Sequence, residues 1–313
     1  MSGTKLIISH APHIKGFGSV PGMMYGVILA LLPASLAGVI FFGLPALMVI
    51  ATCVVTAVVT EWLMCLLMKK ENTVMDGSAA ITGLLLALTI SPLMPLYMAA
   101  IGSVVAIAIG KVLFGGLGYN IFNPALVGRG FLVASFPTFM KTWKFLDATT
   151  TATPLTLWKF GGEGTPLIKL FIGNVGGCIG ETSALALLIG GAFLIFAKII
   201  DWRMPAAYVG TVAALGGILW LIDPAKYPGP LFQVLAGGLL IGAFFMATDL
   251  VTTPVTRLGT WIFGIGAGII VIVIRAWGGL PEGVMFSILL MNALTPLINR
   301  YTRPKIFGKG KKK

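Results

Sequence analysis

Residues 23–43, MMYGVILALLPASLAGVIFFG, are followed closely by residues 46–68, ALMVIATCVVTAVVTEWLMCLLM, and each run is long enough to cross a membrane as a helix. Of the 313 residues, 57% are hydrophobic and only 10% are charged, whereas a soluble domain carries about 25% charged residues. The mean hydropathy is +0.98. We therefore expect an all-α integral membrane protein with about ten transmembrane helices, and the candidate spans are roughly 23–43, 46–68, 78–91, 96–114, 124–136, 182–200, 205–222, 231–247, 258–274 and 282–299.

The basic residues indicate which side of the membrane the chain ends face. Ten spans place both termini on one side, and the basic residues of the loops are divided evenly between the two sides. The loops on the side of the termini carry Lys69, Lys70, Lys111, Lys198, Arg203 and Arg257, and the opposite loops carry Lys141, Lys144, Lys159, Lys169, Lys226 and Arg275. The terminal segments add further basic residues, including the tail RPKIFGKGKKK. The positive-inside rule therefore predicts that both termini are cytoplasmic.

A long polar connection divides the spans into two sets of five. The predicted order is a cytoplasmic N-terminus (1–22), a first five-span repeat (23–136), an outer-face loop (137–181), a second five-span repeat (182–299) and a basic cytoplasmic tail (300–313). A connection of this length is usually functional or disordered.

The two halves are similar in sequence. TGLLLALTISP from Thr82 resembles GGLLIGAFFMATD from Gly237, and the Gly-Gly-Leu at Gly115 recurs at Gly278. Because each half has an odd number of spans, such repeats would be inverted in the membrane. Chance similarity between Gly- and Leu-rich helices is the alternative.

The third and eighth spans, 78–91 and 231–247, are short, contain glycine and end in polar or proline residues. Interrupted helices of this kind expose backbone groups that need a ligand or an ion, and they point to a site near the middle of the membrane. A plain short span shielded by its neighbours is an equally good interpretation.

Several features argue against other classes of protein. Cys53, Cys65 and Cys178 lack metal-ligand spacing, and His10 and His13 are isolated, so neither an iron–sulfur cluster nor another metal site is expected. The net charge of +12 comes mostly from loops and the tail, as the positive-inside rule explains, so no nucleic-acid partner is implied. The tail is interpreted first as a solvated cytoplasmic end and second as a contact with anionic lipid head groups. The first apolar run begins near residue 23, so we expect no cleavable signal peptide.

One hydroxyl-rich run interrupts the outer loop. It reads Asp147-Ala148-Thr149-Thr150-Thr151-Ala152-Thr153-Pro154-Leu155, in a chain that is otherwise poor in such clusters. Taken alone, these residues are typical of turns and helix caps.

The same run resembles the D-x-x-(S/T)-x-A-(S/T) sequence in which flavin transferases attach FMN, through its phosphate, to the last hydroxyl. That hydroxyl belongs to Thr153 here, with Asp147, Thr150 and Ala152 at the other motif positions. Ala148 and Thr151 depart from the commonest form of the motif. A phosphoester needs an accessible nucleophilic hydroxyl, which an outer loop supplies.

The rest of the chain resembles the RnfD/NqrB family over nearly its whole length. The similar segments are Pro12-His13, ALLPA from Ala30, DGSAAITGLLLAL from Asp76, GGLGYNIFNPALVGRGF from Gly115 and FMATD from Phe245. The chain has no long N-terminal extension before these segments, and in this it is more similar to the Rnf members of the family.

The resemblance implies a component of a multi-subunit complex in the bacterial inner membrane. Such a complex passes electrons between ferredoxin and NAD and moves Na⁺ or H⁺ across the membrane. This component would relay electrons through covalent FMN, and through a second, non-covalent flavin, riboflavin, without being catalytic alone. Its partners would be the other Rnf subunits, a flavin transferase and membrane lipids.

Four polar residues near the membrane are candidates for a flavin or ion path: Asn120, Asn123, Arg129 and Asp249. Asn123 before a proline is typical of a helix start. Arg129, an arginine within a span, is a functional candidate. The alternatives are that its side chain extends to the membrane surface or that it forms a structural ion pair with Asp249 or Glu181. Asp249 is either a functional carboxylate or a helix-end residue exposed to the cytoplasm. Glu181 is interpreted first as the acidic N-terminus of the sixth span and second as a neighbour of the flavin loop.

Two other functions fit the same spans. An inverted repeat with interrupted helices is also what a flavin-free channel or transporter for a small solute would show. A purely structural membrane anchor for redox partners is the other alternative. Flavin that remains on the denatured polypeptide would distinguish the electron-transfer interpretation from the transporter.

Overall fold

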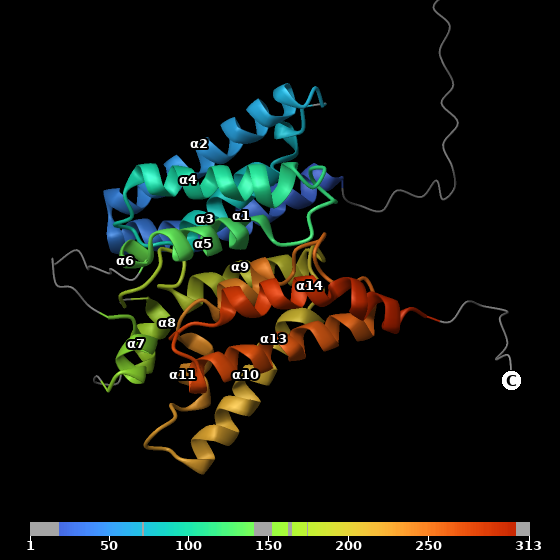
Figure 1. Ribbon diagram of the computed structural model, residues 1–313. Helices are drawn as coiled ribbons and strands as arrows, with labels where there is room; N and C mark the ends of the chain where they lie inside the picture. The colour runs from blue at the N-terminus through green and yellow to red at the C-terminus, as the bar shows by residue number, and fades with distance from the viewer. Residues whose placement is uncertain (1–18, 71, 141–151, 162–164, 174, 305–313) are drawn as a thin grey trace, which may run out of the picture.

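The structure, a computed structural model, describes residues 19–70, 72–140, 152–161, 165–173 and 175–304, and its regular secondary structure there is entirely helical (Figure 1). The helices of the first half are α1 (Val20–Phe42), α2 (Leu44–Leu67), the short 3-10 helix η1 (Val74–Asp76), α3 (Ser78–Leu88), α4 (Leu96–Ile107) with its π-helical continuation η2 (Ala108–Val112), and α5 (Pro124–Ser135).

Three short helices lie between the halves, and a second long set follows. The short helices are α6 (Pro137–Met140), α7 (Pro154–Lys159) and α8 (Leu167–Ile172). The second set is α9 (Ala184–Phe196), α10 (Arg203–Ile222), α11 (Pro230–Leu235), α12 (Leu239–Ile241) with its π-helical continuation η3 (Gly242–Met246), α13 (Arg257–Trp277) and α14 (Val284–Thr302).

In the described part of the chain, α1, α2, α10 and α13 are long and apolar enough to cross a membrane, and several shorter apolar helices accompany them. Many of their large apolar side chains face outward, Ile40 and Leu67 among them. A helical surface of this kind is suited to lipid, because each helix satisfies its own backbone hydrogen bonds. The expectation of an all-helical membrane protein is confirmed at this level.

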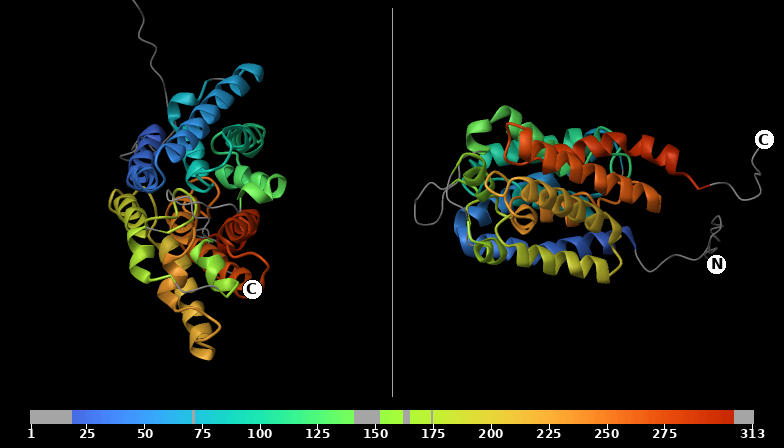
Figure 2. Two further views of the ribbon diagram at one scale, coloured as in Figure 1. Left: turned by 90° about the vertical axis from the view of Figure 1, so that its left-hand side faces the viewer. Right: turned by 90° about the horizontal axis from the view of Figure 1, so that it is seen from below.

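The helices form two groups that meet side by side (Figure 1). α1 to α5 make one group and α9 to α14 the other, and the main contacts between them run along α1 with α9 and along α5 with α14. The first residue of α1 and the last of α14 lie at one end of the bundle, whereas α7 and α8 lie at the opposite end (Figure 2). The described helices of the long connection, α7 and α8, therefore lie at one end of the bundle.

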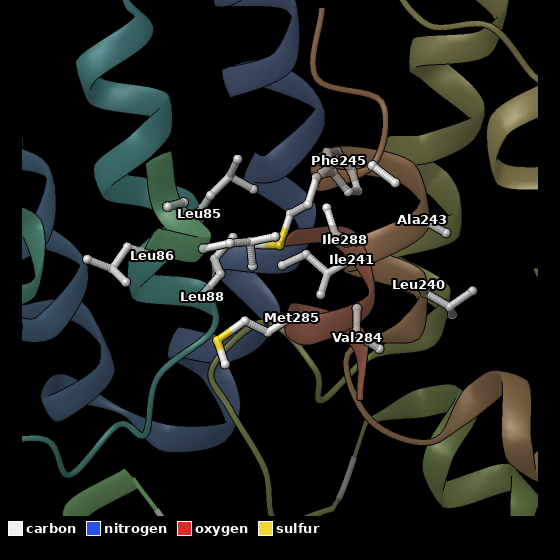
Figure 3. Close-up of a cluster of buried hydrophobic side chains, with 14 of the residues drawn as sticks. Leu85, Leu86, Leu88, Leu240, Ile241, Ala243, Phe245, Val284, Met285 and Ile288 are labelled. Carbon is white, nitrogen blue, oxygen red and sulfur yellow. The ribbon is translucent and has the colours of Figure 1, made fainter. Parts of the chain in front are cut away.

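The interrupted helices α3 and α12–η3 meet in the centre of the protein. α3 has 11 residues, which span roughly 16 Å, about half of the hydrocarbon core. Its C-terminal carbonyl groups are satisfied by the chain before α9: Gly180 N donates to Leu88 O at 2.7 Å. Side chains of α3, α12–η3 and α14 converge there on a common apolar core, in which the labelled residues are Leu85, Leu86, Leu88, Leu240, Ile241, Ala243, Phe245, Val284, Met285 and Ile288 (Figure 3).

The predicted spans match the helices within a few residues. The eighth span is interrupted, and two basic residues expected in loops lie elsewhere. The eighth span breaks at Gly237, whose φ of +71° is the left-handed conformation that glycine adopts without strain. Lys111 and Arg275 were assigned to loops, and this is wrong. Both lie within helical segments and are almost completely buried, because each has polar partners inside the protein. The connection between the two halves, expected as an outer-face loop, contains the helices α6, α7 and α8.

Candidate functional site

Thr153 is the N-cap of α7. Its Oγ1 accepts a hydrogen bond from Thr156 N at 3.3 Å and lies 2.7 Å from Thr156 Oγ1. Pro154 occupies the first helical turn, where its missing N–H costs nothing. Of the attachment motif, Ala152 and Thr153 are described and half-buried, whereas Asp147 and Thr150 lie outside the described residues.

Thr153 lies at the wall of a cavity of about 490 Å³, called here the Thr153 cavity. The volume is within the range of roughly 300–1,000 Å³ that is usual for ligand and cofactor sites. Its lining combines apolar side chains with one cation and two carboxylates, and the residues are Arg129, Val133, Pro137, Met140, Ala152, Thr153, Thr156, Phe160, Glu181, Gly279, Leu280, Pro281, Glu282, Met285 and Phe286.

Lys159 fastens the helix that carries Thr153 to the end of α13. Its Nζ donates to the carbonyl oxygens of Arg275, Gly278 and Leu280 at 3.0, 2.5 and 2.8 Å, and to that of Ile274 at 3.3 Å. Partial burial lowers the pKa of Lys159, while the carbonyl groups at a helix C-terminus favour its charged form. The result is a fixed position for α7 beside the cavity.

Arg129 of α5 is the cation of the cavity. Its Nη2 lies 2.9 Å from Glu282 Oε2 and 3.7 Å from Glu181 Oε1. The same nitrogen is 3.8 Å from Cys178 Sγ. The three charged residues come from positions far apart in the sequence, and each is at least three-quarters buried at its side chain. Pairing of this kind offsets the cost of burying charged groups away from water.

The break between α11 and α12 completes this end of the cavity. Gly238 N donates to Glu282 Oε1 at 2.9 Å. A side chain at Gly237 would lie only 2.6 Å from the same Glu282 oxygen, so a larger residue would push the carboxylate away. Arg275 of α13 donates to the carbonyl oxygens of Gln233 and Ala236, at 2.5 and 3.1 Å, and so satisfies the C-terminal end of α11.

A second, smaller cavity, called here the Asp249 cavity, has a volume of about 80 Å³. Its lining includes Met24 near the start of α1 and Ser78 at the start of α3. Thr252 Oγ1 donates to Asp249 Oδ2 at 3.1 Å. Asn123 caps α5 through Ala125 N and also donates from Nδ2 to Met246 O at 3.2 Å. The polar residues that line the cavity are Ser78, Thr82, Lys111, Asn120, Asn123, Thr248 and Asp249.

Beside this cavity, Lys111 of the π-helical segment η2 forms a buried ion pair with Glu61 of α2. The Nζ–Oε1 distance is 2.7 Å, and the two side chains are only 2% and 1% exposed. Lys111 Nζ also donates to Ser78 Oγ at the start of α3, and Thr73 Oγ1 donates to Glu61 Oε1 at 2.7 Å. The pair ties α2, α3 and α4 together.

The structure separates the four candidates for a flavin or ion path. Asn120, Asn123 and Asp249 share the Asp249 cavity, whereas Arg129 belongs to the Thr153 cavity. Of the alternatives for Arg129, pairing with Glu181 is found and pairing with Asp249 is not. Asp249 is half-buried at the end of η3, not fully exposed.

The first interpretation of Glu181, as the cap of the sixth span, is wrong. The side chain of Ser183 caps α9, and Glu181 instead turns into the Thr153 cavity, because its partner Arg129 lies there. In its second interpretation Glu181 is a neighbour of the loop that carries Thr153, and both residues line the same cavity.

Sequence reasoning missed four residues of these sites: Glu61, Lys159, Glu282 and Arg275 as a buried group. Glu61 is an acidic residue inside an otherwise apolar span, a pattern that marks a buried and paired charge, so it was detectable. Glu282 is the first residue of the predicted span 282–299, and nothing in its local sequence distinguishes it from an acidic residue at the exposed start of a helix.

Similarity to known proteins extends over nearly the whole chain. The sequence model of the NQR2, RnfD, RnfE family matches residues 7–308. The chain is 48% identical to the D subunit of the proton-translocating ferredoxin:NAD(+) oxidoreductase complex of Clostridium ljungdahlii, covering 96% of each chain. It is 46% identical to the D subunit of the Na(+)-translocating ferredoxin:NAD(+) oxidoreductase complex of Acetobacterium woodii, covering 98% of this chain and 97% of the other. The D subunit of the ion-translocating oxidoreductase complex of Stutzerimonas stutzeri is 39% identical, with 93% of each chain covered.

Proposed function

The chain belongs to the NQR2, RnfD, RnfE family, and we infer that it is the D subunit of an ion-translocating ferredoxin:NAD(+) oxidoreductase complex, the Rnf complex. Identity of 46–48% over nearly the full length of two such subunits supports this assignment. The chain is therefore a multi-pass protein of a membrane-bound complex and works with other Rnf subunits. The similarity extends to a proton-translocating and to a Na⁺-translocating relative alike, so the coupled ion is H⁺ or Na⁺.

We propose that Thr153 carries FMN, attached by a flavin transferase through a phosphoester at Oγ1. The observation that carries this proposal is the place of the Thr153 hydroxyl, at the wall of a cavity large enough for a cofactor. The apolar side chains of Met140, Met285 and Phe286 would hold a flat aromatic ring, and Arg129 would face its polar edge. When bound, FMN supplies electron transfer.

The protein's own residues prepare this cavity. Lys159 holds α7 in place, so the Thr153 hydroxyl is fixed relative to Arg129. Glu282 orients the Arg129 guanidinium through a charge-assisted hydrogen bond. A fixed cation near a redox cofactor favours the form that carries more negative charge.

The test is a pair of variants made in cells that contain the native modification machinery. Thr153→Val should abolish covalent flavin, seen as fluorescence of the polypeptide in a denaturing gel, while the complex still assembles. Thr156→Val, which removes a hydroxyl three residues away, should retain it. Mass spectrometry of the peptide that contains Thr153 locates the attachment. An unmodified peptide from the native complex would exclude the proposal, and flavin-free wild-type protein would favour a transporter.

The Asp249 cavity supports a second role, in the ion path. Its volume of about 80 Å³ is below the range usual for cofactor sites, so in this conformation it does not fit riboflavin. An ion or a few water molecules fit it better, and a carboxylate with hydroxyl and amide neighbours suits a hard cation or a proton. Asp249→Asn should leave assembly and FMN at Thr153 normal but weaken ion transport or electron transfer in reconstituted vesicles. Wild-type rates and coupling in that variant would contradict this role.

We also propose that about ten spans form two inverted repeats, 23–136 and 182–299. Contacts support it: α2 packs on α3 and α4 much as α10 packs on α11 and α13, and α4 packs on α5 as α13 packs on α14. Lys111 donates a hydrogen bond to Ser78 Oγ at the start of α3, and Arg275 donates one to Gln233 O within α11. Their partners Ser78 and Gln233 are separated by 155 residues, the same separation as Thr82 and Gly237.

The proposed orientation places both termini in the cytoplasm and the segment 137–181, with the FMN loop, on the outer face. The start of α1 and the end of α14 lie at the same end of the bundle, and α7 lies at the opposite end (Figure 2). Single cysteines at Lys144 and Lys311, which both lie outside the described residues, should be labelled from opposite sides of the membrane. Labelling from one side would contradict the orientation.

A further inference from the structure

Two carboxylates from distant parts of the chain share one cation at the wall of the Thr153 cavity. Glu181 precedes α9, and Glu282 lies between α13 and α14. Arg129 Nη2 is 2.9 Å from Glu282 Oε2 but 3.7 Å from Glu181 Oε1. Of these two carboxylates, Glu282 is therefore the one that accepts a direct hydrogen bond from Arg129.

The two carboxylates are not equally stabilised. Glu282 has a second hydrogen bond, from Gly238 N at 2.9 Å. Glu181 Oε1 is buried and has no hydrogen-bond partner among the described residues, although the Glu181 side chain is only 5% exposed. A buried carboxylate oxygen that lacks a hydrogen bond makes the ionised form costly, whereas the neutral form is much less so. Glu181 is therefore the member of the pair that takes up a proton more readily.

The groups around Glu181 make its proton affinity sensitive to charge in the cavity. Arg129 of α5 and Arg275 of α13 are the nearby cations, and Glu282 and Cys178 complete the ionisable neighbours. A side chain at Gly238 would lie 2.7 Å from Glu181 Oε1, so the carboxyl group sits directly against the backbone of this glycine. In so enclosed a place, a charge a few ångströms away acts strongly.

We propose that Glu181 is a proton-binding site that compensates the charge of an electron arriving in the Thr153 cavity. The proposal rests on the proposed function, in which that cavity holds FMN. One electron enters from the reduced partner of the Rnf complex, and one proton from solution forms an O–H bond at the Glu181 carboxylate. When the electron leaves, that bond breaks and the proton returns to solution. Phe160 in the cavity wall is 70% exposed, so the cavity reaches the surface of the described protein.

The first experiment measures the midpoint potential of the covalent flavin in the purified complex at a series of pH values. A tenfold change in proton activity corresponds to about 59 mV for one electron, so the wild-type potential should fall by up to that amount per pH unit. In Glu181→Gln the proton bound at this carboxylate is lost, so the potential should fall less steeply with pH over the same range. The matched control is Asp223→Asn, and it should behave as wild type. The Asp223 carboxylate accepts a hydrogen bond from Lys226 N, and Lys226 O accepts one from Trp158 of α7.

The second experiment needs no flavin and separates this inference from the proposed function. In the complex with Thr153→Val, infrared difference spectra between two pH values should show a protonated carboxyl band. The band should disappear in Thr153→Val/Glu181→Gln and shift in Thr153→Val/Glu181→Asp, which covers a failure of the Gln variant to assemble. If Thr153 proves unmodified, this band still tests the proton site alone.

Three results would overturn the inference. They are a pH-independent potential in the wild-type complex, a wild-type pH dependence in Glu181→Gln, and a carboxyl band that persists without Glu181. The first two results would show that proton binding at Glu181 is not coupled to arrival of the electron. The third would assign the proton to another group.

Discussion

Removal of one partner of the Glu61–Lys111 pair should destabilise the protein far more than removal of both. The Nζ–Oε1 distance is 2.7 Å, and neither side chain is more than 2% exposed. Lys111→Met leaves Glu61 with a single hydrogen bond, from Thr73, while its other oxygen has no partner among the described residues. Glu61→Gln removes the negative charge beside the buried Lys111 ammonium, which then has only neutral acceptors, Ser78 Oγ and the new amide oxygen.

The exposure of the two side chains sets the size of the effect. Breaking a fully buried pair by removing one partner costs about 3–5 kcal/mol, because a charge stays buried without compensation. Replacement of both partners by groups of similar size is often nearly neutral, since the cost of desolvating both charges disappears as well. We therefore expect each single variant to lose about 3–5 kcal/mol of the free energy of unfolding, and Glu61→Gln/Lys111→Met to be more stable than either.

The assay is equilibrium unfolding in mixed micelles with a denaturing detergent, followed by tryptophan fluorescence. A control is the exposed pair of Arg203 and Asp201, with side chains 27% and 40% exposed, where Arg203→Met should cost at most about 1 kcal/mol. If the double variant loses the sum of the two single losses, the side chains are not coupled and the reasoning from burial is refuted.

Two further predictions concern packing and the anchoring of α7. Gly83→Ala should cost about 1–3 kcal/mol of unfolding free energy, because its methyl group would lie 2.6 Å from the Cys53 carbonyl oxygen of α2. Gly210→Ala has open space around it and should stabilise α10 by about 0.5–1 kcal/mol. The same unfolding assay checks both, and equal effects would contradict the close approach of α2 and α3. Lys159→Met removes the contacts to the end of α13 and should lower the fluorescence anisotropy of flavin on Thr153, whereas Lys169→Met, at an exposed position on α8, should leave it unchanged. Equal anisotropy in both variants would show that Lys159 does not hold the helix.

Local sequence was sufficient wherever a residue's neighbours along the chain set its structure. The predicted span 124–136 is α5 (Pro124–Ser135), and Asn123 before Pro124 caps it as the Asn-Pro pair indicates. The span 78–91 is the short α3, and 231–247 is broken at Gly237, as two short, glycine-containing segments led us to consider. Hydropathy predicts such elements because a backbone in lipid must satisfy its own hydrogen bonds.

Local sequence was therefore enough to assign the class of protein, the extent of its helices and the segment that carries Thr153. It was not enough to assign which charges are buried together: Lys111 with Glu61, and Arg129 with Glu181 and Glu282. Span assignment uses the polarity of neighbouring residues, whereas a buried charge is stabilised by whichever group the packing of other helices brings within a few ångströms. Residues 129, 181 and 282 meet only once the two halves of the chain have packed together.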